Sequence, residues 1–400
     1  MGIRWRMLGL AFLSQNLALG ITFGSYGLLM GDLAEDFAAS RSTVSFGLGL
    51  ITLSMGLVSP LLGRVLDSWS IRNTMIIGAL LSALGFQLTA HAGSLGLFLF
   101  YFGVVVGVGV TALGILPASK LAANWFPGST GKALGFVTLP ALIALGPPLF
   151  GSILADVGWR QLFIIFSYVY LALIPLLFLI KDKPAAAPAA PTSAGLSPAL
   201  SATSSLRDPR LWALVLIGGV MFPSGVVIVT HIVQHALGQG MELGRASWLL
   251  SINGMASVAG GMLFGWLCDR LTPVKALTIN LALQATAWTL LLFLTNTAGL
   301  TLGVIVIGLC NGGTFAALSA LAGRLFGIDR LASSVGQMQL LIIPFTFGAA
   351  PLAGYLFDIS GSYRPAFALH AGVCLLAALI LALRGGRLTR SYQSGQPVPA

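Results

Sequence analysis

Residues 73–119 read NTMIIGALLSALGFQLTAHAGSLGLFLFYFGVVVGVGVTALGILPAS, and the stretch contains no Asp, Glu, Lys or Arg. A membrane helix needs about 20 predominantly apolar residues to cross the hydrocarbon core of a bilayer. The stretch is therefore long enough for two crossings joined by a tight turn, which we place near His91–Ser94. A similar run over 276–323 predicts a second pair of crossings, with its turn near Asn296–Gly299.

Eight further runs free of these charged residues are each one crossing long, which brings the predicted total to twelve transmembrane helices. Along the chain, two runs of one crossing are followed by a run of two crossings and then by two more runs of one crossing. This order occurs once before residue 182 and again after residue 210. We therefore predict an all-α membrane protein made of two six-helix bundles. The eight runs are 7–31, 42–63, 133–155, 161–180, 211–241, 246–268, 331–357 and 365–383.

The composition excludes a soluble protein. Hydrophobic residues make up 56% of the chain, charged residues only 8%, and the mean hydropathy is +0.93. A soluble domain carries about 25% charged residues, which it needs to cover its surface. Cys268, Cys310 and Cys374 are far apart and form no CxxC pair, so we expect no disulfide framework, no metal site and no cofactor.

Two local matches support an internal repeat. The motif GRVLD at 63–67 corresponds to GWLCD at 265–269, and PLFG at 148–151 corresponds to PLAG at 351–354. The two offsets are 202 and 203 residues, close to half the chain length. Internal repeats with a binding site at their interface are the usual architecture of secondary transporters.

The repeat suggests the domain boundaries. We predict a first bundle over 1–181, a cytoplasmic linker over 182–210, a second bundle over 211–384 and a cytoplasmic tail over 385–400. Pro, Ala and Ser dominate residues 182–206, which is typical of a flexible, water-exposed segment. A simple tether is the preferred interpretation, and a regulatory loop is the alternative.

Lys and Arg predict the orientation, because cytoplasmic connections of membrane proteins carry an excess of both. With the N-terminus inside, seventeen of these residues fall in cytoplasmic segments and four, Arg41, Arg160, Arg245 and Arg364, fall outside. Both termini are therefore expected in the cytoplasm, with the protein in the inner membrane. The net charge of +10 then reflects topology, and we expect no nucleic-acid partner.

The segment after the second predicted crossing resembles a motif of the major facilitator superfamily, Gly-x-x-x-Asp-Arg-x-Gly-x-Arg. Gly63, Asp67 and Arg72 match this motif, and its repeat is matched more loosely by Gly265, Asp269 and Arg270. The resemblance implies a latch that holds the cytoplasmic side shut, because a carboxylate at a helix end can cap a neighbouring helix and pair with a cation. Ser68 stands where the first copy usually has a basic residue.

Within this superfamily the chain most resembles the monocarboxylate carriers and oxalate–formate exchangers. The resemblance rests on Asn124–Phe126 leading into Lys132–Gly135, on Thr230–Val233 and on Pro351–Phe367. It implies transport of a small organic anion.

The chain also departs from that branch. Residues 251–261 lack the Asp–Arg pair of the animal carriers, and Ser25 and Tyr26 stand near the position of their first-helix Lys. Residues 332–357 carry no basic side chain, unlike the exchangers.

Uncharged polar residues at mid-depth are then the best candidate substrate contacts, because amides and hydroxyls can hydrogen-bond a carboxylate. Each of them is also suited to an interhelical hydrogen bond. We predict substrate binding by Asn16, Tyr26, Thr111, Ser224, Asn253, Asn311 and Gln337, with Gln15, Ser25 and Thr314 as further lining residues.

Charged and titratable candidates are few, since no acidic residue falls inside a predicted crossing. His231 and His235 lie four positions apart and allow three interpretations: hydrogen bonding to backbone or water, proton relay, or a metal pair that lacks a third ligand. We include His231 and Lys120 among the substrate-binding candidates. Lys120, like Arg324, is explained either by snorkelling to the cytoplasmic interface or by attraction of an anion at the inner mouth.

The leading hypothesis is a secondary transporter that moves a monocarboxylate-like or oxalate-like anion by alternating access, with a proton or counter-anion as a possible partner, and that acts as a monomer. The alternative is an exporter of a lipophilic or amphipathic compound. An enzyme is not expected, because the chain has no HExxH, no GxSxG and no paired intramembrane carboxylates.

Overall fold

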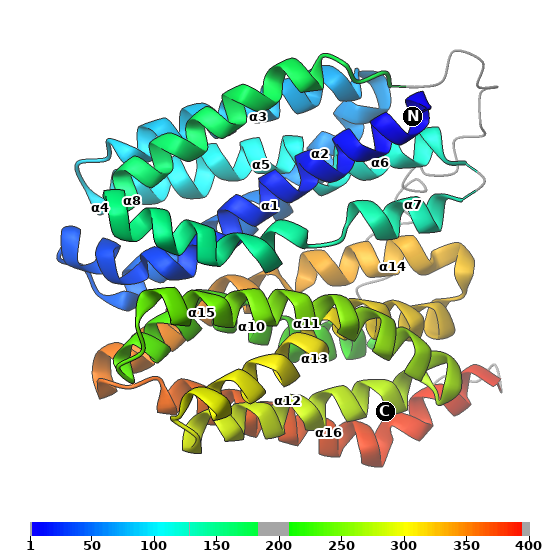
Figure 1. The fold of residues 1–400 in the computed structure, drawn as a ribbon. Helices are drawn as coiled ribbons and strands as arrows, with labels where there is room; N and C mark the ends of the chain where they lie inside the picture. The colour runs from blue at the N-terminus through cyan, green and yellow to red at the C-terminus, as the bar shows by residue number, and fades with distance from the viewer. Residues whose placement is uncertain (1, 128, 183–207, 394–400) are drawn as a thin grey trace.

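A computed structural model describes residues 2–127, 129–182 and 208–393 of the protein. The side chains of Asp67 and of residues 130–132, 328–333 and 386–393 lie outside this description. Every regular element in the described ranges is a helix, in agreement with the predicted all-α class (Figure 1). Most of the predicted linker, 183–207, lies outside the described residues, as does the end of the predicted tail, 394–400.

The first half of the chain forms one bundle, in which α1 and α3 both pack against α8. Its helices are α1 (Ile3–Asp36), α2 (Arg41–Ser68), α3 (Ile71–Ala90), α4 (Leu95–Phe100), the π-helix η1 (Tyr101–Val106), α5 (Gly107–Leu113), α6 (Ile115–Trp125), α7 (Thr130–Val137) and α8 (Ala141–Leu177).

The second half forms a matching bundle, in which α11 packs closely on α13 and α12 on α16. Its helices are α10 (Pro209–Gly238), α11 (Leu243–Arg270), α12 (Pro273–Phe293), α13 (Thr297–Phe326), α14 (Ile328–Leu341), α15 (Ile343–Ser360) and α16 (Arg364–Gln393).

Eleven helical segments of the described chain are long and apolar enough to cross a membrane. One of them, Ala133–Leu177, has 45 residues and contains the predicted crossings 133–155 and 161–180. Within it, Gly158 has φ 75° and ψ 168°, a conformation that no helix contains and that favours glycine. The kink lies between the two predicted crossings and divides the segment into two arms. The protein has twelve transmembrane crossings if each arm spans the membrane, so that number stays a prediction.

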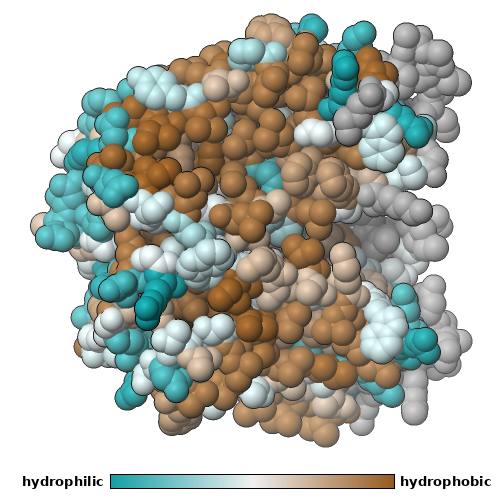
Figure 2. All heavy atoms as spheres, viewed as in Figure 1, coloured by the Kyte–Doolittle hydropathy of each residue, from teal (hydrophilic) through white to brown (hydrophobic). Residues whose placement is uncertain are grey.

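The exterior is consistent with a bilayer environment. Figure 2 shows a broad band of hydrophobic side chains, with hydrophilic side chains gathered at the ends of the helices. Leu57, Leu145, Met262 and Leu376 are among the large apolar residues left exposed on helix surfaces. Such a surface is stable against lipid and not against water.

Helix caps repeat between the two halves. Ser70 accepts a hydrogen bond from the backbone of Asn73 at the start of α3, and Thr272 caps α12 in the same way. Ser94 caps α4 and Asn296 caps α13, at the two turns predicted inside the long apolar runs. Both pairs are separated by 202 residues, the offset of the motif repeat.

Glycines bring α11 and α13 into close contact. A Cβ added to Gly260 would lie 1.9 Å from the carbonyl oxygen of Leu309, and one added to Gly312 would lie 1.7 Å from that of Ser257. Small residues of this kind let membrane helices approach until their backbones touch.

We predict that Gly260→Ala separates α11 from α13 and destabilises the second bundle by about 1–3 kcal/mol, the usual effect of overpacking. Thermal unfolding of the detergent-purified protein measures the change as a lower melting temperature. The control is Gly265→Ala on the same helix, where an added Cβ meets no atom within 4 Å. Equal melting temperatures for the two variants would contradict the prediction.

Candidate functional site

The two bundles meet at one end. We call this the outer end, following the predicted orientation; it contains the connections 37–40, 239–242 and 361–363. Contacts between the bundles are made chiefly by α2 with α15, α8 with α11 and α1 with α10. They are close: a Cβ on Gly27 would lie 2.2 Å from the carbonyl oxygen of Val229, and one on Gly354 would lie 2.7 Å from the Cα atom of Ser42.

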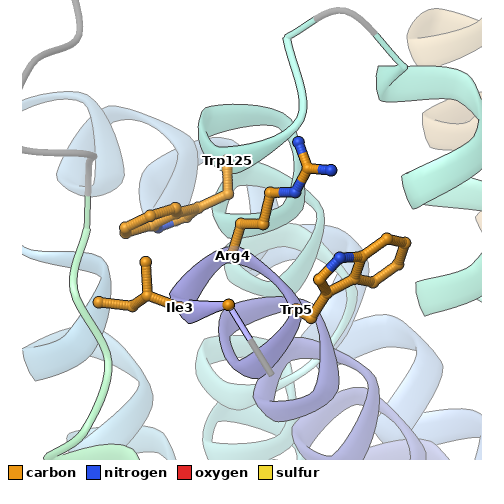
Figure 3. A pocket seen from close by; sticks show the side chains of 5 residues that line it. Ile3, Arg4, Trp5 and Trp125 are labelled. Carbon is orange, nitrogen blue, oxygen red and sulfur yellow. The ribbon is translucent and has the colours of Figure 1, made fainter.

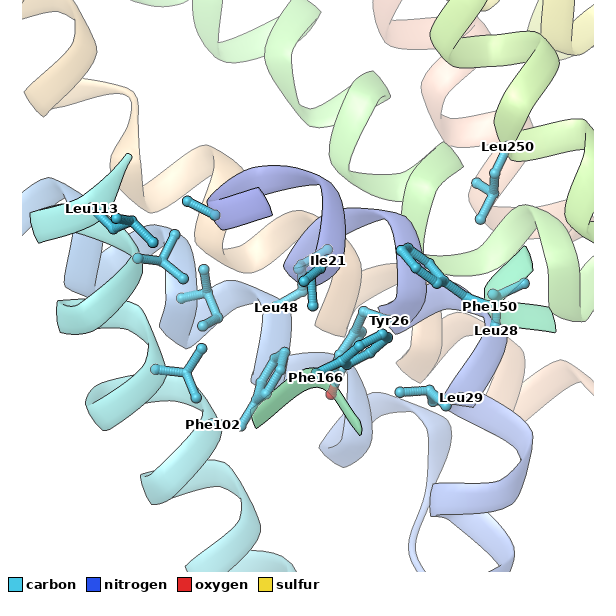
Figure 4. Close-up of a cluster of buried hydrophobic side chains, with 14 of the residues drawn as sticks. Ile21, Tyr26, Leu28, Leu29, Leu48, Phe102, Leu113, Phe150, Phe166 and Leu250 are labelled. Atoms are coloured by element: carbon cyan, nitrogen blue, oxygen red, sulfur yellow. The ribbon is translucent and has the colours of Figure 1, made fainter. Parts of the chain in front are cut away.

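The buried cores show the same asymmetry. One continuous hydrophobic core joins the first bundle to the outer half of the second, and Figure 4 shows Phe150 and Leu28 of the first bundle with Leu250 of α11. In the same cluster, the rings of Tyr26 and Phe102 stack with centroids 5.0 Å apart. The inner half of the second bundle has a separate core that includes Leu211, Phe264 and Leu321.

At the inner end the bundles part. Along α2 the contact with α15 extends to Gly56, which faces the side chain of Ile343, whereas a Cβ on Gly63 would meet nothing within 4 Å. The described parts of the predicted cytoplasmic latch are not in contact across the two bundles. A Cβ on Gly265 would also meet no atom within 4 Å. Asp269 and Arg270 are exposed and form no ion pair with any described side chain. The side chain of Asp67 lies outside the described residues.

A set of side chains, which we call the outer clasp, joins α2 to the second bundle. Its members are Arg41, Ser42, Asp358, Tyr363 and His231. The backbone N–H groups of Arg41 and Ser42 donate to the two carboxylate oxygens of Asp358 at 3.1 and 3.0 Å. Asp358, at the end of α15, thereby caps the N-terminus of α2, where free N–H groups and the helix dipole both favour a carboxylate.

Arg41 extends the clasp inward. Its Nη1 donates to the hydroxyl oxygen of Tyr363 at 2.9 Å, and its guanidinium lies 4.2 Å from the ring centroid of Phe357. Tyr363 is buried and lies in the short connection between α15 and α16. Burial raises the pKa of the Tyr363 hydroxyl, and the neighbouring Arg41 opposes the shift only in part, so the hydroxyl keeps its proton.

His231, on α10, is the deepest member of the clasp and is fully buried. Its Nδ1 lies 3.2 Å from the Tyr363 hydroxyl, and its Nε2 lies 2.9 Å from the carbonyl oxygen of Ala350 on α15. Of the three interpretations left open for this residue, the geometry matches hydrogen bonding to the backbone.

The other histidines are packed as ring partners. His235 contacts the ring of Phe367 with centroids 4.9 Å apart, and its Nε2 is buried without a hydrogen-bond partner. His370 contacts Trp288 at 5.0 Å. No group of three metal-ligating side chains occurs within the part of the chain that the structure describes, so the metal-pair interpretation finds no third ligand there.

Several predicted substrate contacts use their polar atoms within the bundles. Asn16 accepts from the backbone N–H of Leu142 at 2.9 Å and so caps α8, which begins after a break at residues 138–140. The hydroxyl of Tyr26 donates to the carbonyl oxygen of Val44. Thr111 donates to the Gly107 carbonyl one turn earlier on its own helix.

The same holds in the second bundle. The hydroxyl of Ser224 accepts from the indole Nε1 of Trp288 at 2.9 Å, and Asn253 donates to the carbonyl of Val304 at 3.2 Å. These bonds join neighbouring helices, which is the alternative role foreseen for such residues.

Three of the side-chain amides predicted to line the pathway have polar atoms without a hydrogen-bond partner in the part of the chain that the structure describes. Asn311 on α13 and Gln337 on α14 are half-buried, and neither side chain has a hydrogen-bond partner among the described residues. The carboxamide of Asn311 lies 3.4 Å from the position of a Cβ on Gly225 of α10, so that glycine leaves room beside it. The Oε1 of Gln15 is buried without a partner near Gly114, where the backbone breaks between α5 and α6.

Lys120 lies at the inner end of the first bundle. Its Nζ donates to the carbonyl oxygen of Leu66, near the end of α2, at 2.7 Å. Nearby, Asp182 accepts from the backbone N–H groups of Ile71 and Arg72 and so caps α3. The first residue of the predicted linker is therefore bound to the first bundle.

Two pockets lie away from the predicted substrate contacts. One, of about 450 Å³, is at the inner end of α1 and is lined by Gly2, Ile3, Arg4, Trp5 and Trp125 (Figure 3). The other, of about 290 Å³, lies between α10, α15 and α16 and is lined mainly by apolar residues, with His370 among them.

Arg41, Asp358 and Tyr363 are not among the residues that the sequence predicts for the site. Arg41 contributes only to the predicted orientation, and Asp358 and Tyr363 belong to the family-like segment Pro351–Phe367. A signal did exist, because Arg41 begins the second crossing and Asp358 ends the eleventh, on the same side of the predicted membrane. Their pairing across 317 positions was not derivable without the arrangement of the bundles.

Two helical bundles with apolar exteriors, joined at one end and parted at the other, define an integral multi-pass membrane protein. The family model of the Major Facilitator Superfamily matches residues 12–341, with a further match over 225–398. The chain therefore belongs to the major facilitator superfamily, and it is a transporter for small-molecule substrates and not an enzyme.

Curated relatives extend over most of the chain. The uncharacterized MFS-type transporter YhjX of Escherichia coli is 26% identical over 346 residues, which is 84% of each chain. Monocarboxylate transporter 13 of Rattus norvegicus is 28% identical over 94% of this chain and 87% of its own. Monocarboxylate transporter 11 of Homo sapiens is 24% identical over 95% and 82% respectively.

Solved structures share the fold. A bacterial homolog of the human lysosomal transporter Spinster, in an inward-facing and unoccupied conformation, superposes with a TM-score of 0.75 at 14% identity and covers 100% of both chains. The nucleoside transporter NupG gives a TM-score of 0.77 at 13% identity over 96% of this chain and 99% of its own.

We predict that Asp358→Ala weakens the outer clasp, because loss of a helix cap typically costs about 1 kcal/mol, or about fivefold in an equilibrium. Spin labels on Glu35→Cys and Gln239→Cys, both exposed at the outer end, report the separation of the bundles by electron–electron distance measurement. The labelled background replaces Cys268, Cys310 and Cys374 by Ala. We expect a longer distance to gain population.

The matched control is Asp156→Ala. Asp156 precedes Asp358 by 202 residues, at the outer end of the first arm of α8, and its exposed carboxylate has no bonded partner among the described residues. Its removal should leave the distance distribution unchanged. Identical distributions for Asp358→Ala and the parent would show that the cap does not hold the outer end closed.

Proposed function

We propose that the protein is a secondary active transporter of the inner membrane that moves a small organic anion, monocarboxylate-like or oxalate-like, by alternating access. The observation that carries the proposal is the outer clasp, which joins the bundles at one end while they part at the other. With the predicted orientation, this is an inward-facing arrangement. A monomer contains both bundles and so suffices for the cycle.

The charge distribution favours an anion over a cation. All eleven acidic residues lie at helix ends or in connections, so a cation at mid-depth has no counter-ion. At the inner mouth, Arg270 and Arg324 are exposed and have no acidic partner among the described side chains. Together with Lys120 they supply positive charge where a cytoplasmic anion arrives.

Recognition at mid-depth is assigned to Asn311 and Gln337, with Gln15 as a further contact, because their amides keep hydrogen-bonding capacity that the bundles do not use. Asn16, Tyr26, Thr111, Ser224 and Asn253 take positioning roles, since their polar atoms hold neighbouring helices or turns together. The named monocarboxylate transporters among the relatives support a carboxylate as the substrate.

One observation supports a second candidate function, export of a lipophilic compound. The pocket between α10, α15 and α16 is lined by Val220, Pro223, Phe345 and Leu352, among others. Phe345 and Leu352 are also exposed on the surface of the protein. An apolar molecule in the bilayer can therefore reach this pocket without passing through water.

We predict saturable exchange of short labelled monocarboxylates or oxalate in proteoliposomes that contain the purified protein. Asn311→Ala should raise KM by about tenfold to a hundredfold, because one hydrogen bond to a charged ligand contributes about 1.5–3 kcal/mol. The control is Thr286→Ala, whose hydroxyl bonds only to Ala282 on its own helix. Transport of a lipophilic dye without any carboxylate exchange would favour the second candidate and overturn the first.

A further inference from the structure

The hydrogen bonds of the outer clasp form one directed chain. The guanidinium of Arg41 can only donate, so the oxygen of Tyr363 accepts from it. The carbonyl of Ala350 can only accept, so the Nε2 of His231 carries a hydrogen and donates to it. A neutral imidazole has a single N–H, and the Nδ1 of His231 must therefore accept from the hydroxyl of Tyr363.

This direction depends on a neutral His231. A second proton on the imidazole would occupy Nδ1, and the hydrogen there would face the hydroxyl of Tyr363. The Tyr363 oxygen would then have two donors, and its own hydrogen would lose its acceptor. The new positive charge would also share the Tyr363 oxygen with the guanidinium of Arg41.

Among the described residues, the groups around His231 offer no acidic partner that is free to pair with that charge. Asp358 on α15 is the acidic residue of the clasp, and both of its oxygens already accept from the N-terminus of α2. The remaining groups are neutral or basic: Ser45 and Arg41 on α2, Tyr363 in the connection, His235 on the same helix and His370 on α16.

We propose that His231 is a proton-binding switch for the outer gate, which stays closed while the imidazole is neutral and opens when the imidazole is protonated. The inference rests on the proposed alternating-access function and adds its regulation. The proton comes from water on the outer side and binds Nδ1. The Tyr363 hydroxyl turns away, and the hydrogen bond that the Arg41 side chain donates to it is lost, which weakens the clasp. Closure reverses these steps and returns the proton to the outer side.

The switch predicts that acid on the outer side favours the outward-open state. A difference of one pKa unit between the two states changes their ratio about tenfold. The span from about pH 8 to about pH 5.5 covers the usual range of histidine titration. Transport in either direction then becomes sensitive to outer pH without a fixed number of protons moved per cycle.

The test is the distance between spin labels on Glu35→Cys and Gln239→Cys, measured in lipid nanodiscs at about pH 8 and about pH 5.5. We expect acid to populate a longer distance in the parent by about tenfold and to have no effect in His231→Gln. His91→Gln is the matched control, because His91 lies at the outer end of α3 and, among the described residues, its imidazole bonds to the Gln87 carbonyl alone. It should respond like the parent.

A second variant keeps the test informative if the His231→Gln protein does not fold. Tyr363→Phe removes the hydroxyl that links Arg41 to His231, so the outer end should already be more open than in the parent at about pH 8, and acid should open it little further. A parent without pH response, a response that survives in His231→Gln, or one abolished instead by His235→Gln would each overturn the proposal. The measurement uses no substrate, so it stays informative even if carboxylate exchange fails.

Discussion

Inside a bilayer, no water is available to satisfy a backbone N–H or carbonyl group, and the rest of this structure depends on that constraint. Helices satisfy most of these groups, but a break in a helix needs a partner from elsewhere. The break before α8 is capped in this way by Asn16 of α1. At the two ends of the bundles, Asp358 and Asp182 likewise cap the first N–H groups of α2 and α3. Polar side chains are therefore used first to hold the fold.

This use of polar groups narrows the search for a binding site. A side chain such as Ser224, which already accepts from Trp288, adds little affinity for a ligand, because binding would have to break that bond. Asn311 and Gln337 bear no such bond within the described chain, so a ligand gains their hydrogen bonds without that loss. The proposed function therefore assigns selectivity to these amides and to the charge of the inner mouth.

The sequence alone predicted the helical class, the superfamily and the turns at His91–Ser94 and Asn296–Gly299, because long charge-free runs and caps are local features. It did not predict the interruptions at Gly114 and Ile342, although Pro117 and Pro344 follow them and lack the N–H group that would continue the preceding helix. The outer clasp was also out of reach, since Arg41 and Asp358 meet only after two bundles are placed. The predicted latch at Gly63 and Gly265 lies at the parted inner ends, and its closed form stays a prediction.

The positions of two acidic residues explain how the two ends can alternate. Asp358 ends α15 at the outer side and caps the start of α2, while Asp67, a predicted member of the cytoplasmic latch, lies near the inner end of α2. The helices α2 and α15 lie against each other, so tilting one relative to the other brings one pair of ends together as the other pair separates. In the proposed cycle each cap forms only between ends that touch, so the two caps compete. Protonation of His231, by the proposed switch, weakens the outer clasp and therefore shifts the balance toward closure of the inner side.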